Sequence, residues 1–270
     1  MITFDAKTIL IQIMKVVIFA GGIGSRISEE SHLRPKPMIE IGGKPILWHI
    51  MKLYAAHGFN DFVICLGYKG HMIKEYFYNY YLQNTDFTID VANNTIIYHK
   101  TNADNFKITL IDTGLNTMTA GRLKQVKEFT GNEDFMLTYG DGVADVDIKA
   151  LLHFHNSHHK IATVTAVKPP SKFGTMEITN DAVSSFREKS AADGSYINGG
   201  FFVLKQDVFN YLNDDCTNIM WEDYPLENLS NDGQLMAYKH EGFWKCMDAL
   251  RDKNDLEEMW NNGNAKWKNW

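Results

Sequence analysis

A glycine-rich segment with two nearby cations is the part of the sequence best suited to binding phosphate. Residues 20–26 read AGGIGSR and directly follow the short apolar run KVVIFA at residues 15–20. A glycine-rich turn at the carboxyl end of a buried strand lets backbone N–H groups approach phosphate oxygens without interference from Cβ atoms. Arg26 and Lys36 add positive charge close by. The pattern predicts an anion site formed by Ala20, Gly21, Gly22, Ile23, Gly24, Ser25, Arg26 and Lys36.

Two familiar phosphate-binding motifs do not fit this segment. A dinucleotide-binding fingerprint that starts at Gly22 needs a third glycine at the position of Ile27. A P-loop that ends at Lys44 needs a glycine at the position of Met38 and a hydroxyl residue at the position of Pro45. The glycines alone would suit an empty strand-to-loop turn equally well, so the phosphate hypothesis depends on the two cations.

Carboxylates that could hold a metal ion follow two other parts of the chain. Asp141 comes after the apolar run FMLTYG and lies between Gly140 and Gly142, which predicts the same sheet edge as the glycine-rich segment. Asp248, in WKCMDALRD, precedes the last predicted helix and is the candidate for a second ligand. Magnesium is usually held by one or two carboxylates together with substrate phosphates and water. Three further aspartates are better explained as helix caps or surface residues: Asp145, Asp147 and Asp252.

Composition and charge exclude several classes of protein. The 270 residues carry a net charge of −6, which argues against a nucleic-acid partner. An odd number of widely spaced cysteines argues against a disulfide framework and favours a reducing compartment. No apolar run approaches the roughly 18 residues of a membrane helix. Residues 1–13 lack the basic start and cleavage site of a signal peptide. The sequence predicts a soluble cytoplasmic protein without a membrane partner.

Strand and helix patterns alternate along most of the chain. Short apolar runs predict strands at residues 15–20, 62–66, 108–111, 135–138 and 161–167. Helical spacing predicts helices at residues 45–57, 69–82, 120–129 and 147–156. After Pro169 and Pro170 the pattern predicts shorter strands at residues 175–178, 183–187, 200–204 and 234–239, with helices at 221–230 and 250–260. We therefore expect an extension at residues 1–13 and one α/β domain at residues 14–270, with a mostly parallel sheet and an antiparallel addition beside the ligand cleft.

The segment AGGIGSRISEESHLRPKPMIEIGGKPILWHIMKLY resembles the signature of the sugar-nucleotide pyrophosphorylases, which load sugar 1-phosphates onto nucleotides. The resemblance continues in the same order through DFVICLG, TYGDGVADVD, NGGFFVL and GFWKCMDALRDK, and so covers nearly the whole chain from Met14. It implies the Rossmann-like nucleotide-diphospho-sugar transferase fold. The form EIGGKPILWHIM is similar to the cytidylyl-transferring branch of the family, so CTP and glucose 1-phosphate are the expected substrates.

The resemblance also implies roles for individual residues. Mg²⁺ is expected on Asp141 and Asp248, and catalysis is expected from Arg26, Lys36 and Lys189. Thr117, Arg122 and Gly142 are expected at the nucleotide, in addition to the glycine-rich segment and Asp141. The sugar phosphate is expected to contact Gly174, Glu188, Lys189, Asn198, Gly199 and Glu222. After Lys189 the family usually has a proline, but this sequence has Ser190. The role of the lysine is still expected, whereas the backbone conformation beside it need not match that of the family.

Several alternatives stay open at this stage. A UDP-glucose or dTDP-glucose pyrophosphorylase would share the fold, and so would a regulatory module without activity, although such a module should have lost the charged site residues. Arg122 could instead be a solvated arginine on its helix. The histidine-rich stretch HFHNSHHK invites a metal hypothesis, but we expect its side chains to diverge around a helix. We also expect a homo-oligomer, to which the tryptophan-rich tail at residues 260–270 could contribute, and a role in dideoxysugar supply for surface polysaccharide.

Overall fold

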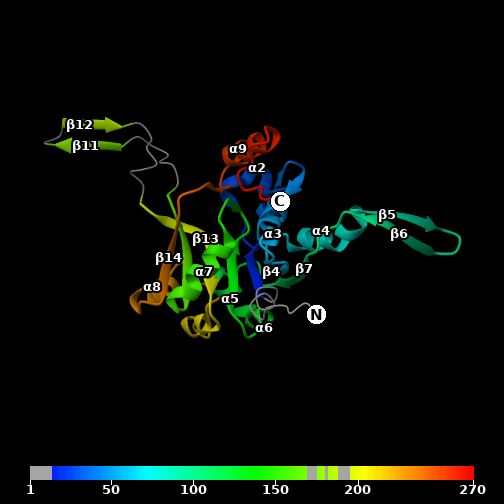
Figure 1. Ribbon diagram of the computed structural model, residues 1–270, viewed down its shortest axis with the longest axis horizontal. Coiled ribbons are helices and arrows are strands. Elements are labelled where there is room, and N and C mark those ends of the chain that lie inside the picture. Colours follow the sequence, from blue (N-terminus) through cyan, green and yellow to red (C-terminus); the bar gives the residue numbers. More distant parts are fainter. Residues whose placement is uncertain (1–13, 169–174, 180–181, 188–194) are drawn as a thin grey trace, which may run out of the picture.

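A seven-stranded sheet forms the centre of the protein (Figure 1). The structure is a computed structural model, and it describes residues 14–168, 175–179, 182–187 and 195–270. The expected extension at residues 1–13 lies outside the described residues. The strand order is β14-β10-β13-β8-β1-β4-β7. In chain order these strands are β1 (Lys15–Phe19), β4 (Asp61–Leu66), β7 (Lys107–Asp112), β8 (Phe135–Tyr139), β10 (Ala162–Val167), β13 (Ile197–Leu204) and β14 (Leu235–His240).

The sheet is mixed but mostly parallel, which confirms the predicted fold class. β8, β1, β4 and β7 run parallel to one another, and β14 runs parallel to β10. β13 is antiparallel to both β8 and β10 and therefore joins the two parallel groups. The strand predicted at residues 234–239 exists, but its place in the antiparallel addition was wrong. A strand that pairs with β10 at the edge of this sheet has no local feature that shows its direction.

Helices cover both faces of the sheet. Alternate residues of β1 face opposite cores: Val16 and Ile18 lie in one, and Val17 and Phe19 lie in the other. The first core is closed by α3 (Ile46–Ala56), α4 (Gly70–Gln83), α7 (Ile148–His158) and α9 (Leu250–Asn261). The second is closed by α5 (Thr119–Gln125) and α8 (Tyr224–Asn231). The helix predicted at residues 120–129 is in fact two, because α6 (Lys127–Thr130) follows α5 as a separate turn. Among the described residues, none of the helices combines the length and the apolar character needed to cross a membrane.

Short elements outside the central sheet were mostly missed by the sequence patterns. β5 (Thr85–Asp90) and β6 (Thr95–Thr101) form a hairpin that projects from the end of α4 (Figure 1). β11 (Thr175–Thr179) and β12 (Ala182–Arg187) pair antiparallel, and the sequence predicted both strands. Two further pairs have strands of only two or three residues, too short to show a period: β2 (Glu40–Ile41) with β3 (Lys44–Pro45), and β9 (Gly142–Ala144) with β15 (Trp244–Cys246). Short helical segments complete the fold: η1 (Ser25–Ile27), α2 (Ser28–Ser31), η2 (Lys36–Met38) and η4 (Gln206–Tyr211).

The tryptophan-rich tail packs on its own chain. Trp267 is 1% exposed, and its ring lies against Phe243 and Trp260. Its indole N–H donates to Nδ1 of His49 at 3.3 Å, and Nε2 of His49 donates to the carbonyl of Ile41 at 2.8 Å. Burial lowers the pKa of His49 to about 4, so the ring is neutral and can accept from the indole. The hypothesis that this tail docks on another subunit is wrong for Trp267, whose surface is already buried within the chain.

Replacing Trp267 should therefore destabilise the fold. We expect Trp267→Ala to lower the free energy of unfolding by about 3–5 kcal/mol, because it leaves a large cavity and an unpaired His49. Urea unfolding followed by circular dichroism measures the change. Lys266→Ala, at an exposed neighbouring position, is the control and should leave the unfolding midpoint in place. An unchanged midpoint for Trp267→Ala would contradict this packing.

Candidate active site

The carboxyl ends of three parallel strands place the predicted site residues along one edge of the sheet. The glycine-rich loop at residues 20–24 follows β1, and Asp141 follows β8. The amide of Ala20 donates to the carbonyl of Cys65 in β4 at 3.0 Å, and the amide of Gly140 donates to the carbonyl of Phe19 at 2.9 Å. These bonds hold the three strand ends side by side, as expected for ligand sites at the carboxyl edge of an open α/β sheet.

The backbone amides of the glycine-rich loop are available to a ligand. Among the residues that the structure describes, none accepts a hydrogen bond from the amides of residues 21–24. Gly24 has φ of 70°, in the left-handed region that favours glycine, and a Cβ there would lie 3.1 Å from Cβ of Lys36. Ile23 is 53% exposed and does not line a cavity, so its side chain is not brought to the site. The loop can therefore present several N–H donors to an anion, as the sequence predicted.

Arg122 ties this loop to the neighbouring strand ends. Its guanidinium group donates to the carbonyl oxygens of Gly21 at 3.1 Å and of Leu66 at 2.8 Å, and to Oγ1 of Thr113 at 2.6 Å. A Cβ on Gly21 would lie 2.1 Å from a guanidinium nitrogen, so only glycine fits there. Arg122 is 3% exposed, which overturns the alternative of a solvated arginine. The side chain lines the cavity but is already bonded to protein, which favours a role in positioning the loop.

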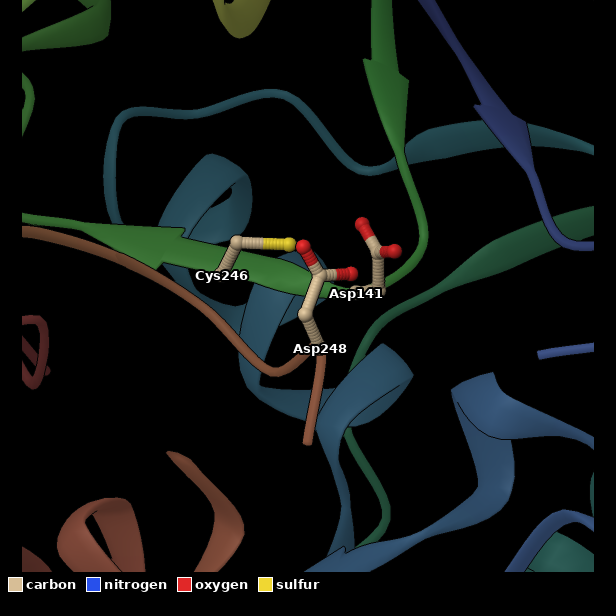
Figure 2. A group of neighbouring side chains, drawn as sticks. All are labelled: Asp141, Cys246 and Asp248. Carbon is tan, nitrogen blue, oxygen red and sulfur yellow. The ribbon is translucent and has the colours of Figure 1, made fainter. Parts of the chain in front are cut away.

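Two carboxylates and a thiol meet beside the loop (Figure 2). β15 pairs with β9, so that Cys246 lies opposite Gly142, and the amide of Met247 donates to the carbonyl of Asp141 at 2.9 Å. This pairing brings Asp248 to Asp141 from a distant part of the sequence. One oxygen or sulfur atom of each of Asp141, Cys246 and Asp248 lies within 4.8 Å of the others. Burial and the charge of Asp141 raise the pKa of the Cys246 thiol, so it is protonated.

The ammonium group of Lys36 lies between the two carboxylates. It donates to Oδ2 of Asp141 at 2.6 Å and to Oδ1 of Asp248 at 2.7 Å, and Arg26 donates to Oδ2 of Asp248 at 2.9 Å. Burial by itself would lower the pKa of Lys36, but the charge of Asp141 and the two hydrogen bonds raise it. Burial likewise acts to raise the pKa of Asp248, and its bond to Lys36 and the charge of Arg26 lower it overall. Lys36 and Asp248 are therefore both charged. Carboxylates such as Asp141 and Asp248 are suitable ligands for a divalent cation.

Two adjoining cavities share these charged residues. The first, of about 280 Å³, is lined by most of the predicted nucleotide residues: Ala20, Gly21, Gly22, Gly24, Ser25, Arg26, Lys36, Thr117, Arg122 and Asp141. The second, of about 260 Å³, is lined by the predicted sugar residues that the structure describes: Asn198, Gly199 and Glu222. Gly142, predicted at the nucleotide, lines the second cavity. Arg26, Tyr139, Asp141 and Asp248 line both, so a ligand in either cavity would lie beside the same charges.

A hydrogen-bonded network forms one wall of the second cavity. The hydroxyl of Tyr139 donates to Oε1 of Glu222 and accepts from the side-chain amide of Asn198 at 3.1 Å. The other oxygen of Glu222 accepts from Thr119, at the start of α5, at 3.0 Å. Burial and the charge of Glu222 raise the pKa of Tyr139, so the phenol remains a donor. Carboxylate and amide groups held in this way can recognise vicinal sugar hydroxyls.

The sequence missed some of the residues that form the site. Cys246 was not predicted, although it stands two residues before Asp248 in an extended segment and so points to the same side. Tyr139 and Thr119 have no local signal, because their partner Glu222 is distant in sequence. Three predicted sugar-phosphate residues lie outside the described residues, and their roles stay predictions: Gly174, Glu188 and Lys189.

Two histidines at the end of α7 contact one side chain of β10. His155 and His158 both bond to Oγ1 of Thr163 at 2.8 Å. Within the described part of the chain, Asp141, Cys246 and Asp248 form the one group with the proximity that metal binding needs. The two histidines therefore anchor the end of α7 to β10.

Comparison with known proteins agrees with this fold. The nucleotidyl transferase family model matches residues 15–249, and the chain belongs to this family. Enzymes of the family generally use a divalent metal ion. A glucose-1-phosphate cytidylyltransferase from Salmonella typhimurium is 53% identical over 95% of this chain and 100% of its own length. A probable glucose-1-phosphate cytidylyltransferase from Bacillus subtilis is 45% identical over 95% and 100% of the two chains.

Solved structures show the same fold at much lower identity. A putative glucose-1-phosphate thymidylyltransferase from Bacillus anthracis has a TM-score of 0.69 and 19% identity, covering 95% of this chain and 97% of its own. A UDP-glucose pyrophosphorylase complexed with UDP-glucose has a TM-score of 0.66 and 16% identity, covering 93% and 99%. At such identities the likeness establishes the fold and leaves the choice of base and sugar to other evidence.

The geometry of Arg122 leads to a prediction that separates positioning from direct contact. We expect Arg122→Ala to lower the free energy of unfolding by roughly 1–3 kcal/mol, because buried carbonyls lose their donor. We also expect nucleotide affinity to fall at least about tenfold, about 1.4 kcal/mol, because the loop loses its tie. Urea unfolding and equilibrium nucleotide binding measure the two effects, with the exposed Arg251→Ala as control. Weakened binding without any loss of stability would show that Arg122 contacts the ligand directly.

Proposed function

We propose that the protein transfers the cytidylyl group of CTP to α-D-glucose 1-phosphate, forming CDP-glucose and pyrophosphate. The observation that carries this proposal is the full-length similarity to glucose-1-phosphate cytidylyltransferases, at 53% and 45% identity. The two adjoining cavities with shared charges support it, because the reaction needs two anionic substrates beside one another. The other enzymes of the same fold, with UTP or dTTP as the nucleotide, are the alternative.

The reaction is an in-line displacement at the α-phosphorus of CTP. A phosphate oxygen of glucose 1-phosphate forms the new P–O bond, and the bond to the β-phosphate breaks to release pyrophosphate. The attacking oxygen is already anionic, so no general base is needed, and catalysis consists of positioning and charge stabilisation. The free amides at residues 21–24 and the guanidinium of Arg26 would hold the triphosphate and the leaving group.

Lys36 lines the first cavity and is bonded to Asp141 and Asp248, which line both cavities. Its ammonium group would neutralise charge on the α-phosphate and on the attacking phosphate, a role the resemblance also gives to Lys189. Asp141 and Asp248 would hold Mg²⁺, which when bound supplies a dication that polarises the α-phosphoryl group. Asn198 and Glu222, held by Tyr139, would bind the glucose hydroxyls, with Gly174, Glu188 and Gly199 as further sugar-side residues.

Selection of cytosine would depend on the part of the first cavity nearest Thr117. Cytosine presents an amino donor and an unprotonated N3, whereas uracil presents O4 and N3–H. A site built for the first pattern leaves polar groups unpaired on meeting the second, at a cost of roughly 1–3 kcal/mol for each buried group. Thr117 is buried and lines the cavity beside the exposed Met118 and the start of α5, which makes this segment the candidate determinant.

Substrate choice is the direct test of the proposed function. We expect pyrophosphate release from CTP with glucose 1-phosphate, and much less from UTP, dTTP or GTP. Each nucleotide is assayed against glucose 1-phosphate and its epimers, with Mg²⁺ present and then removed by chelation. Comparable turnover of UTP or dTTP would refute the cytidylyl assignment and leave the family assignment in place. Absence of turnover with every nucleotide would favour the regulatory module.

We infer that the protein acts in the cytoplasm, where CTP is available and cysteines stay reduced. Cys65, Cys216 and Cys246 are all free thiols, which supports this setting. The reaction product would supply dideoxysugar synthesis for surface polysaccharide. We further infer that residues 14–270 act as one nucleotidyltransferase domain and that residues 1–13 are an extension that activity does not need.

We also propose that the protein is a homo-oligomer that uses the β5–β6 hairpin. Ile89 pairs with Ile96 and Phe87 pairs with Tyr98, so these four side chains share one face of the hairpin. Each is between 43% and 55% exposed, although the residues are large and apolar. Tyr81 at the end of α4 extends the same apolar surface, with its ring 5.5 Å from that of Tyr98. A second copy presenting the same face would bury it by two-fold symmetry.

Opposite faces of the hairpin provide a matched test of this surface. We expect Ile89→Lys to convert the oligomer to a monomer, because burying a charge against an apolar partner face is costly. Thr88→Lys places the same charge on the opposite face and should leave the oligomer intact. Light scattering coupled to size-exclusion chromatography gives the mass of each variant. A monomeric wild-type protein, or an oligomeric Ile89→Lys variant, would contradict the proposal.

A further inference from the structure

Lys36 occupies the space between the two carboxylates that we assign to a divalent cation. Its ammonium group donates to Asp141 at 2.6 Å and to Asp248 at 2.7 Å, and its side chain is only 12% exposed. With Arg26 on the remaining oxygen of Asp248, three of the four carboxylate oxygens have a cationic partner. A dication that coordinates both carboxylates needs these oxygens at about 2.0–2.6 Å.

Two cations in this space would repel strongly. The Coulomb repulsion between unit charges a few ångströms apart is substantial even near a protein surface, and it is larger for a dication. One oxygen of each carboxylate and the thiol of Cys246 lie within 4.8 Å of one another, and Lys36 bonds to an oxygen of both carboxylates. The lysine and a dication would therefore use the same carboxylate pair. The lysine therefore has to leave its present contacts when a divalent cation binds to both carboxylates.

The surroundings of Lys36 allow such a movement. Cβ of the lysine lies against Gly24 of the glycine-rich loop, at the first cavity. From there the flexible side chain extends to the two carboxylates. On leaving Asp141 and Asp248, the ammonium group remains in the same cavity as the free amides at residues 21–24. It would then face the place where we expect phosphates to bind.

We propose that Lys36 competes with the divalent cation for Asp141 and Asp248, so that the two cations exchange at one carboxylate pair. Lys36 keeps the carboxylates paired in the protein alone and is released toward the phosphate side when the metal ion binds. The inference rests on the divalent-cation site of the proposed function, but it does not depend on which nucleotide or sugar the protein uses. If this exchange occurs, Lys36 can contact the phosphates only after the metal ion has bound.

Binding of Mn²⁺ without nucleotide tests this competition. Electron paramagnetic resonance of free Mn²⁺ gives the dissociation constant for the wild type and for Lys36→Met, Lys36→Arg and Lys52→Met. We expect Lys36→Met to bind Mn²⁺ at least about tenfold more tightly, since the competing charge is gone. Lys36→Arg keeps a competing cation and should show no such gain. Lys52→Met removes a lysine that is paired with Asp104 at 2.6 Å and similarly buried, and should bind like the wild type.

Equal affinities of Lys36→Met and the wild type would overturn the proposal, and so would an absence of Mn²⁺ binding by both. A second measurement uses the wild type alone, in case Lys36→Met does not fold. Reductive methylation followed by peptide mass spectrometry gives the rate at which Lys36 reacts, and we expect Mn²⁺ to raise that rate several-fold. An unchanged or lower rate would contradict release of the ammonium group. A wild type that shows this exchange but does not turn over CTP would refute the proposed function and leave the exchange standing.

Discussion

Arg122 donates hydrogen bonds to the carbonyl oxygens of Gly21 and Leu66, at the ends of two neighbouring parallel strands. The guanidinium group is buried and stays charged, so each of its N–H groups needs an acceptor. If either carbonyl moved away, a buried charged donor would lose its hydrogen bond, which is energetically costly. Fixing Gly21 fixes the direction in which the following amides point. The anion site therefore gains its donors in advance of any ligand, and phosphate binding need not order the loop. This pre-organisation explains why an arginine in the cavity wall can matter to the nucleotide without touching it.

The acidic protein creates a site for polyanions by balancing charges locally. With a net charge of −6, the molecule as a whole does not attract CTP or a sugar phosphate. Arg26 and Lys36 face the first cavity, yet both are partnered by Asp141 or Asp248, so little of their charge is free. If a dication neutralised the two carboxylates, the charges of Arg26 and Lys36 would be free to attract an anionic ligand. The same four side chains are thus paired with one another in the protein alone, and their two cations would face a bound anion once a dication neutralised the carboxylates.

The sequence predicted those parts of this arrangement that depend on residues close together in the chain, and it did not predict those that depend on distant residues. β1, α3 and β8 have short, strongly patterned sequences, and their ends carry glycines, so both the elements and the edge that they share could be predicted. The pairing of β9 with β15 could not, because three-residue strands have no period and their register depends on the whole chain. That pairing brings Cys246 beside Asp141. The hydrogen bonds of Arg122 to the loop could not be predicted either. Their acceptors are mainly backbone carbonyls, and because every residue has one, the sequence does not show which carbonyls are used.

The two cavities are joined mechanically as well as by their shared charges. Asn198 bonds to Tyr139, Tyr139 to Glu222, and Glu222 to Thr119 at the beginning of α5. One turn further along α5, Arg122 bonds to the glycine-rich loop. Glu222 and the glycine-rich loop are therefore both bonded to side chains of the same seven-residue helix. The two cavities are therefore linked by one continuous set of hydrogen bonds, and Asp141 and Asp248 line both of them.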